Sequence, residues 1–213
     1  MNWSLSEIEG LARKAARGAG FSWGMAEEAG KAVRWLAGIG LPGPEALADF
    51  LEAHDRTPHA AMRPADTGAN TWRAQGGIIC PISAGAALCD LAQSDAPSRD
   101  IHIMACAHPL LLLPFVRAAA EDGCQPERMI WAGGAFAFAA DVRGQVDAPS
   151  MASADVEIRA GTAKELTLPS CQMRYDLAEL PAARLAIMAA RTYAPDTEQS
   201  RNAGAGAGLS DND

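Results

Sequence analysis

One short segment carries the side chains best suited to metal chemistry. Residues 101–108 read IHIMACAH, so every second position is a potential metal ligand: His102, Met104, Cys106 and His108. On a β-strand these side chains would share one face, and imidazole and thiolate bind zinc and copper well. A strand buried on both faces explains the same pattern, because Met and Cys are common core residues. The segment therefore predicts a strand and leaves metal binding open.

Two polar residues lie where a predicted strand gives way to a helix. Ser83 follows an apolar stretch at 77–82, and His108 ends the strand at 101–107 and precedes Pro109. Ligands gather at the carboxyl ends of strands in open α/β sheets, and the amides of a first helical turn attract anions. We therefore predict that Ser83 binds substrate and that His108 moves a proton. A helix cap at Ser83 and a turn residue at His108 are the alternative.

The last residues, YAPDTEQSRNAGAGAGLSDND over 193–213, combine polar side chains with glycine. They predict either a flexible tail or a glycine-rich loop that lies over a pocket. In the second interpretation Glu198 is a further catalytic residue, and Arg201 and Tyr193 contact the substrate. The cofactor stays unspecified, because the chain has no dinucleotide-binding, Walker, HExxH or GxSxG motif.

The first quarter of the chain predicts three helices. Apolar residues recur at helical spacing over 5–17, 22–37 and 43–54, with Ser4 or Ser6 and Ser22 available as caps and Pro44 suited to a first turn. Residues 55–75 contain several Pro, Gly and Asn residues without a sustained period and predict a long connection. Connections of this length are often functional or linkers.

The remainder alternates strand-like with helical stretches. We predict strands at 77–82, 101–107 and 129–139 and helices at 83–91 and 109–121, then short antiparallel strands at 155–159, 165–168 and 171–175, and a helix at 180–191. The fold class is therefore α/β or α+β, with N-terminal helices packed on a mixed sheet. The predicted parts are 1–54, 55–75, 76–195 and 196–213, in one compact domain overall.

Composition restricts the partners. The net charge of −8 over 213 residues disfavours nucleic acid, and the longest apolar stretch, 129–140, is too short to cross a membrane. The chain begins without a signal-peptide pattern, and its five cysteines lack CxxC spacing, so we expect a cytoplasmic protein. A small-molecule ligand is the expected partner, and the sequence leaves a homo-oligomer open.

Two segments carry a family resemblance. Residues 13–35 (RKAARGAGFSWGMAEEAGKAVRW) and 193–213 resemble an uncharacterised bacterial family known only as a domain of unknown function. The resemblance extends over most of the chain and implies no activity, cofactor or catalytic residue. It does suggest that the two segments work together.

Three functional hypotheses follow. The first is an enzyme of small-molecule metabolism that acts on a polar or anionic metabolite by acid/base chemistry. The second is a non-catalytic accessory or ligand-binding subunit that pairs with another chain through the apolar run around Phe136 and Phe138. The third is a metal-binding protein that uses the face from His102 to His108.

Overall fold

The computed structural model describes the chain apart from residues 95–97, 122–125, 139–141, 150, 162–170 and 194–213. In chain order its elements are β1 (Asn2–Ser4), α1 (Leu5–Gly18), α2 (Trp23–Gly38), α3 (Gly43–Ala53), the 3-10 helix η1 (His59–Met62), β2 (Thr71–Trp72), α4 (Pro81–Ala92), β3 (Ile101–Ala107), the 3-10 helix η2 (Pro109–Leu112), α5 (Leu113–Glu121), β4 (Pro126–Trp131), β5 (Gly134–Phe138), β6 (Val142–Val146), β7 (Ser153–Ala160), β8 (Arg174–Asp176) and α6 (Glu179–Ala190).

The three predicted N-terminal helices are confirmed as α1, α2 and α3. Ser4 caps α1 through a capping box, in which Glu7 Oε2 accepts the Ser4 amide at 2.8 Å. Ser22 caps α2, since its hydroxyl accepts the Met25 amide at 3.4 Å. Helices α1 and α2 therefore begin where a side chain replaces a missing backbone partner, whereas α3 has no side-chain cap and carries Pro44 in its first turn.

The main sheet has the order β2-β3-β7-β4-β5-β6 and is mixed, as predicted. Only the short β2–β3 pair is parallel among its described pairs, so the fold is of the α+β type. The predicted strand at 77–82 is wrong, because Ile79 makes a single bridge to Cys106 and α4 already begins at Pro81. The predicted strand at 129–139 is instead two antiparallel strands, β4 and β5, joined by a turn between Trp131 and Gly134.

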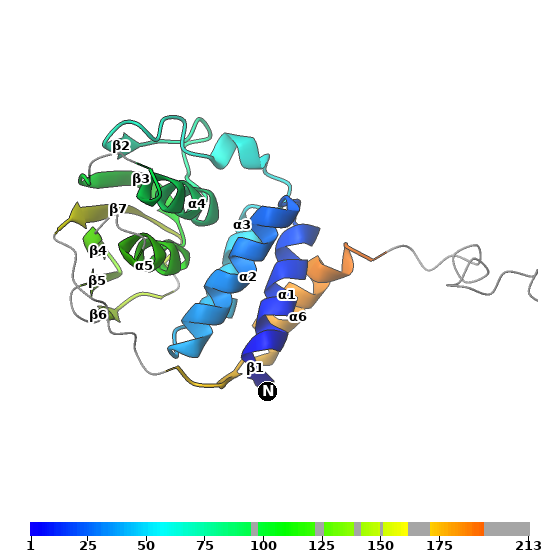
Figure 1. Ribbon diagram of the computed structural model, residues 1–213. Coiled ribbons are helices and arrows are strands. Elements are labelled where there is room, and N and C mark those ends of the chain that lie inside the picture. The colour runs from blue at the N-terminus through cyan, green and yellow to red at the C-terminus, as the bar shows by residue number, and fades with distance from the viewer. Residues whose placement is uncertain (95–97, 122–125, 139–141, 150, 162–170, 194–213) are drawn as a thin grey trace, which may run out of the picture.

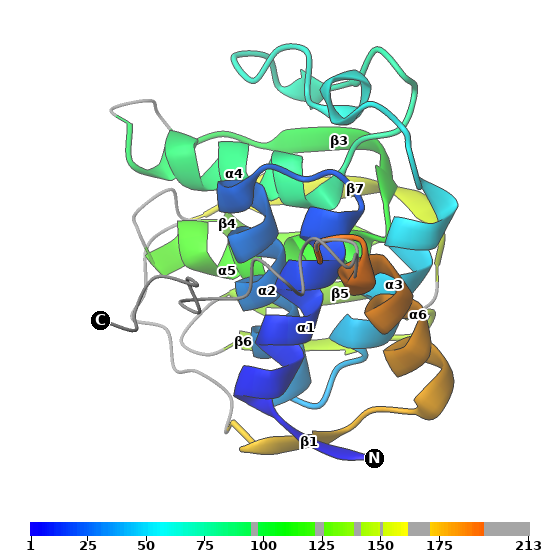
Figure 2. The same ribbon diagram turned by 90° about the vertical axis from the view of Figure 1, so that its right-hand side faces the viewer.

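The elements form layers (Figure 1). Helices α4 and α5 lie on one face of the sheet, α2 packs against both of them and α3 packs against η2, and α1 and α6 are outermost (Figure 2). The N-terminal helices thus reach the sheet through α4, α5 and η2. Gly85 permits the α4–α5 approach, since a Cβ there would lie 2.2 Å from the Phe115 ring.

The core runs through all layers and includes the fully buried side chains of Phe50, Trp72 and Leu111. Phe136 and Phe138 are also buried, and Phe136 stacks on Trp131 at 6.1 Å between ring centroids. The apolar run proposed to pair with another chain is therefore part of the core. Within the described residues, every helix is too short or too polar to span a bilayer.

Candidate functional site

A cleft of about 510 Å³ opens between the helical layers and the chain that leads to α4. Its volume lies within the range of roughly 300–1,000 Å³ that is usual for small-molecule sites. One wall comes from the α1–α2 turn and η1, and the other from one face of α4. Its lining residues are Gly20, Phe21, Ser22, Met25, His59, Ala60, Arg63, Ser83, Ala86, Ala87 and Asp90.

Two helices begin at this cleft. Ser22 is the cap of α2, and Ser83 lies in the first turn of α4, after the cap residue Cys80 and Pro81. Cys80 is fully buried, and burial raises the pKa of its thiol. Hydrogen bonds from the amide and hydroxyl of Ser83 have the opposite, smaller effect and lower that pKa. Cys80 is therefore a neutral core residue, while Ser83 is only half-buried and faces the cleft.

His59 is the imidazole of the cleft. Its ring packs on Phe21 at 4.0 Å between centroids, and its Nε2 lies 3.4 Å from the Ala19 carbonyl oxygen. Burial lowers the pKa of His59, with an opposing contribution from Ala19, so the ring is neutral at pH 7. When Nε2 carries the proton and donates it to Ala19, Nδ1 is the acceptor, and Nδ1 is buried without a hydrogen-bond partner in the described part of the chain.

The cleft also holds two opposite charges. Arg63 follows η1, and Asp90 lies near the carboxyl end of α4; both are exposed. Within the described residues neither side chain forms an ion pair. Both charges are therefore available to a ligand.

His108 occupies a different environment. It is 3% exposed and is the buried polar residue of the described chain. Its backbone is left-handed, with φ of 41°, which is uncommon outside glycine. The ring meets Phe50 edge-on at 6.2 Å, and Nδ1 has no hydrogen-bond partner in the described residues. Burial is the main cause that lowers the pKa of His108; Asp49 opposes it, and His54 and Arg184 reinforce it.

The predicted site residues therefore divide. Ser83 lines the cleft, whereas His108 does not. Tyr193 is 62% exposed and lies beside Lys14 of α1, whose Nζ is 3.4 Å from its hydroxyl, and it does not line the cleft. Glu198 and Arg201 lie outside the described residues.

The predicted metal-ligand face is interrupted. Side chains alternate as expected through Ile103, but the β3–β7 register shifts before Cys106, and Ala105 has φ of 47°. As a result His102 is on the exposed face, while Cys106 and His108 are buried. Among the described residues, no three potential ligands gather in a metal-binding arrangement.

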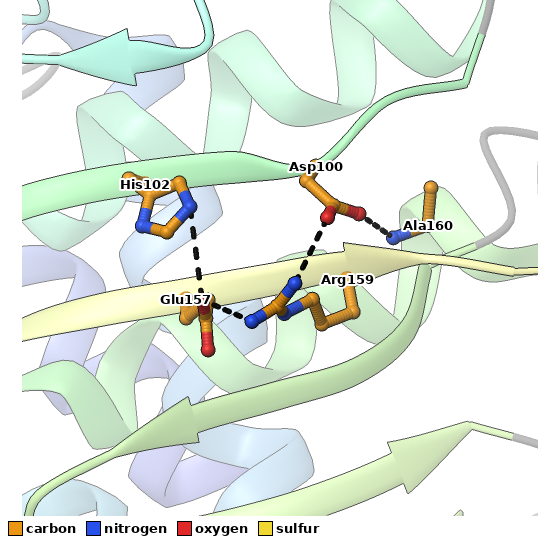
Figure 3. Close-up of polar contacts among 5 residues, drawn as sticks. All are labelled: Asp100, His102, Glu157, Arg159 and Ala160. Carbon is orange, nitrogen blue, oxygen red and sulfur yellow. Dashed lines mark hydrogen bonds and ion pairs between the residues drawn. The ribbon is translucent and has the colours of Figure 1, made fainter.

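The exposed face of the sheet carries an ion-pair network instead (Figure 3). Arg159 of β7 contacts Glu157 at 2.6 Å and Asp100 at 3.2 Å, and His102 Nε2 lies 3.7 Å from Glu157. The Ala160 amide donates to Asp100 at 2.9 Å and is the main cause that lowers the pKa of that carboxyl. These charges satisfy one another on an open surface.

Sequence reasoning missed His59 and Arg63. Both lie in the segment predicted to be a long connection. The available signal was its length, because long connections in compact domains are commonly functional. His59 and Arg63 line the same cleft as Ser83 only because of tertiary contacts, which local sequence patterns do not reveal.

Comparison with known proteins relates the first part of the chain to a family. Residues 3–80 match the model of a family described as a protein of unknown function, DUF3726. The predicted resemblance to an uncharacterised family is thereby confirmed for the segment at 13–35, while the segment at 193–213 lies outside the match. No curated protein and no solved structure matches the chain.

The match ends beside the cleft. The DUF3726 match includes the wall formed by the α1–α2 turn and η1, and it stops at Cys80, immediately before α4. The cleft is therefore lined by the family segment on one side and by the following helix on the other.

Proposed function

We propose that this protein binds a small anionic metabolite in the cleft between the α1–α2 turn, η1 and α4, and acts on it by proton transfer. One observation carries the proposal: the first turns of two helices meet Arg63 at a single cleft. First-turn amides and hydroxyls donate hydrogen bonds to anions, and the helix dipole favours negative charge there.

His59 is the group we assign to proton transfer in the cleft. Its neutral imidazole can accept a proton near pH 7, and Phe21 holds the ring in place. His108, the histidine that the sequence favoured, is the second candidate. Because its ring is buried, a proton can reach it only from the groups that surround it, among which Phe50, Asp49 and Arg184 lie. His59 lines the cleft and His108 does not, so a ligand there lies nearer to His59, whose buried Nδ1 must be exposed by a shift of the ring before it can take a proton.

The C-terminal residues complete the proposal. Arg201 and Glu198 would close over the bound metabolite, with Tyr193 at the base of that segment. Tyr193 supports this only indirectly, since its position beside Lys14 brings the chain to the α1 side of the molecule.

The working environment is part of the same proposal. Cys80, Cys106 and Cys171 are free thiols, which supports the reducing cytoplasm. Leu180 and Ile187 are 70% and 64% exposed on α6, and because they are seven residues, or about two turns, apart they share one face. This apolar face supports a homo-oligomer, which size-exclusion chromatography with light scattering would detect.

Thermal-shift measurements on the full chain test the anion site. Phosphate, succinate and citrate are the probes, because a ligand that binds only the native state raises the unfolding midpoint. We expect at least one of them to do so and Arg63→Gln to weaken its binding about tenfold. Arg73→Gln is the matched control, because Arg73 is exposed and outside the cleft. Equal effects of the two variants would contradict the proposal.

Proton uptake on binding tests the role of His59. An anion near a neutral imidazole favours its protonated form, so binding near pH 6 should take up a proton. Calorimetry in buffers of different ionisation enthalpy measures this uptake. We expect it to disappear in His59→Gln and to persist in His102→Gln, whose imidazole lies on the sheet face. Uptake that survives His59→Gln would assign the proton to another group.

A further inference from the structure

The α4 wall of the cleft has a polar, apolar, polar order. Ser83, Ala86, Ala87 and Asp90 follow the spacing i, i+3, i+4, i+7, so they share one face of the helix, and all four line the cleft. At 1.5 Å per residue, Ser83 and Asp90 lie about 10 Å apart along the helix axis. Two methyl groups separate the hydroxyl from the carboxylate.

The helix itself polarises this wall in the same direction. The first turn of α4, at Ser83, has the positive end of the helix dipole, and the carboxyl end, near Asp90, has the negative end. The Asp90 carboxylate adds to the negative end. A ligand lying along α4 therefore meets an anion-attracting region at one end and a cation-attracting region at the other.

On the opposite wall, Arg63 lies beside the first turn of α4, because the carbonyl of the preceding residue, Met62, accepts the Cys80 amide at 2.9 Å. Ser22 and Arg63 provide polar groups, and Phe21 and Met25 provide apolar surface. Arg63 and Asp90 do not pair with each other in the described structure, although both line the cleft. Two opposite charges that stay apart across an apolar stretch are complementary to a molecule with its own charges at its two ends.

We propose that the cleft selects an elongated zwitterion, with a carboxylate or similar anion at one end, an ammonium group at the other and a methylene chain between them. The anion lies at Ser83 and Arg63, the methylenes lie against Ala86 and Ala87, and the ammonium group pairs with Asp90. This inference rests on the proposed anion site and adds the identity of the second charge and the length of the ligand.

Matched ligands of equal chain length test the proposal on the full chain. The probes are the zwitterions β-alanine, 4-aminobutyrate and 6-aminohexanoate, each compared with the acid that lacks the amine: propionate, butyrate and hexanoate. Hexylamine is the matched cation. We expect the best zwitterion, at the longer end of the series, to bind about tenfold more tightly than its matched acid, as measured by calorimetry.

Asp90→Asn is the decisive variant. It should reduce binding of the best zwitterion to the level of the matched acid and leave binding of the acid unchanged. Because Asp90 is exposed and has no ion pair in the described chain, the variant should fold normally. Asp176→Asn, an exposed aspartate of β8 outside the cleft, is the charge-matched control.

The outcomes separate the two proposals. If each acid binds as tightly as its zwitterion, or if Asp90→Asn changes nothing, the zwitterion proposal is overturned while the anion site stands. If the zwitterions, the acids, phosphate, succinate and citrate all fail to bind, the proposed function is overturned with it.

Discussion

Ser83 and His108 occupy similar places in the chain, yet the structure gives them opposite surroundings. Each follows backbone that pairs in the sheet, and each lies close to the proline that begins a helix. Ser83 comes two residues after Pro81 of α4, and His108 directly precedes Pro109 of η2. Ser83 faces a cleft, whereas His108 is 3% exposed. Similar positions in the sequence therefore do not decide access to solvent.

The neighbours make the difference. Small residues, Gly20, Ala86 and Ala87, leave space beside Ser83. Over His108, α3 brings Phe50 against the ring, and the ion pairs of Arg184 with Asp49 at 2.6 Å and with Glu52 join α6 to α3 nearby. Large, well-packed side chains enclose His108, and small ones leave Ser83 open to the cleft.

The largest expected effect is on the closed region. Phe50→Ala removes a fully buried ring and should reduce the free energy of unfolding by about 3–5 kcal/mol. Met25→Ala, at the cleft, should cost well under that, because Met25 is only partly buried. Guanidinium unfolding measures both. Similar losses in the two variants would mean that the regions do not differ in packing.

The second effect is a loss of stability in acid. Burial lowers the pKa of His54, His59 and His108. These rings therefore bind protons less readily in the folded protein than in the unfolded chain. The unfolded chain then binds more protons below a pH of about 6.5, and stability present above that pH is lost as the pH falls.

Comparison of variants assigns that loss to the closed region. His108→Phe, which keeps an aromatic ring beside Phe50, should flatten the decline in unfolding free energy between pH 7 and pH 5. An unchanged slope in His108→Phe would show that His108 is protonated without cost and is therefore accessible.

Local patterns predicted much of the fold. Helical spacing and caps gave α1, α2 and α3 nearly to the residue, because Ser4 and Ser22 act within three residues of their own positions. The segment at 77–82 was misread because Pro81 starts a helix within an apolar stretch. Buried helix starts and buried strands share the same composition, so periodicity alone could not separate them.

The candidate site was harder to predict. Ser83 could be placed because its neighbours in sequence determine its helix. His59 and Arg63 could not, because they meet Ser83 only after the 55–75 segment folds across α4. The IHIMACAH pattern correctly predicted the strand β3, but it could not show the bulge near Ala105 that separates His102 from Cys106 and His108.

The C-terminal residues are expected to affect the cleft beside Ser83. If Arg201 and Glu198 close over the cleft, truncation after Ala194 should weaken binding of the best probe about tenfold, or roughly 1.4 kcal/mol. The unfolding free energy without ligand should stay the same, because the helix α6 and its core contacts are retained. Binding that survives truncation unchanged would remove the lid from the proposal and leave the cleft intact.

The smallest expected effect compares one arginine from each region. Arg184→Met keeps the aliphatic stem but loses the pairs with Asp49 and Glu52 beside His108, and it should cost about 1 kcal/mol or less, since the pairs are partly solvated. Arg63→Met should cost close to nothing in unfolding experiments, because Arg63 is exposed and lacks an ion pair in the described chain. With a bound anion the order should reverse, because Arg63 then has a partner and Arg184 gains none. Measuring the free energy of unfolding of both variants with and without the probe therefore separates an arginine that stabilises the fold from an arginine that binds a ligand.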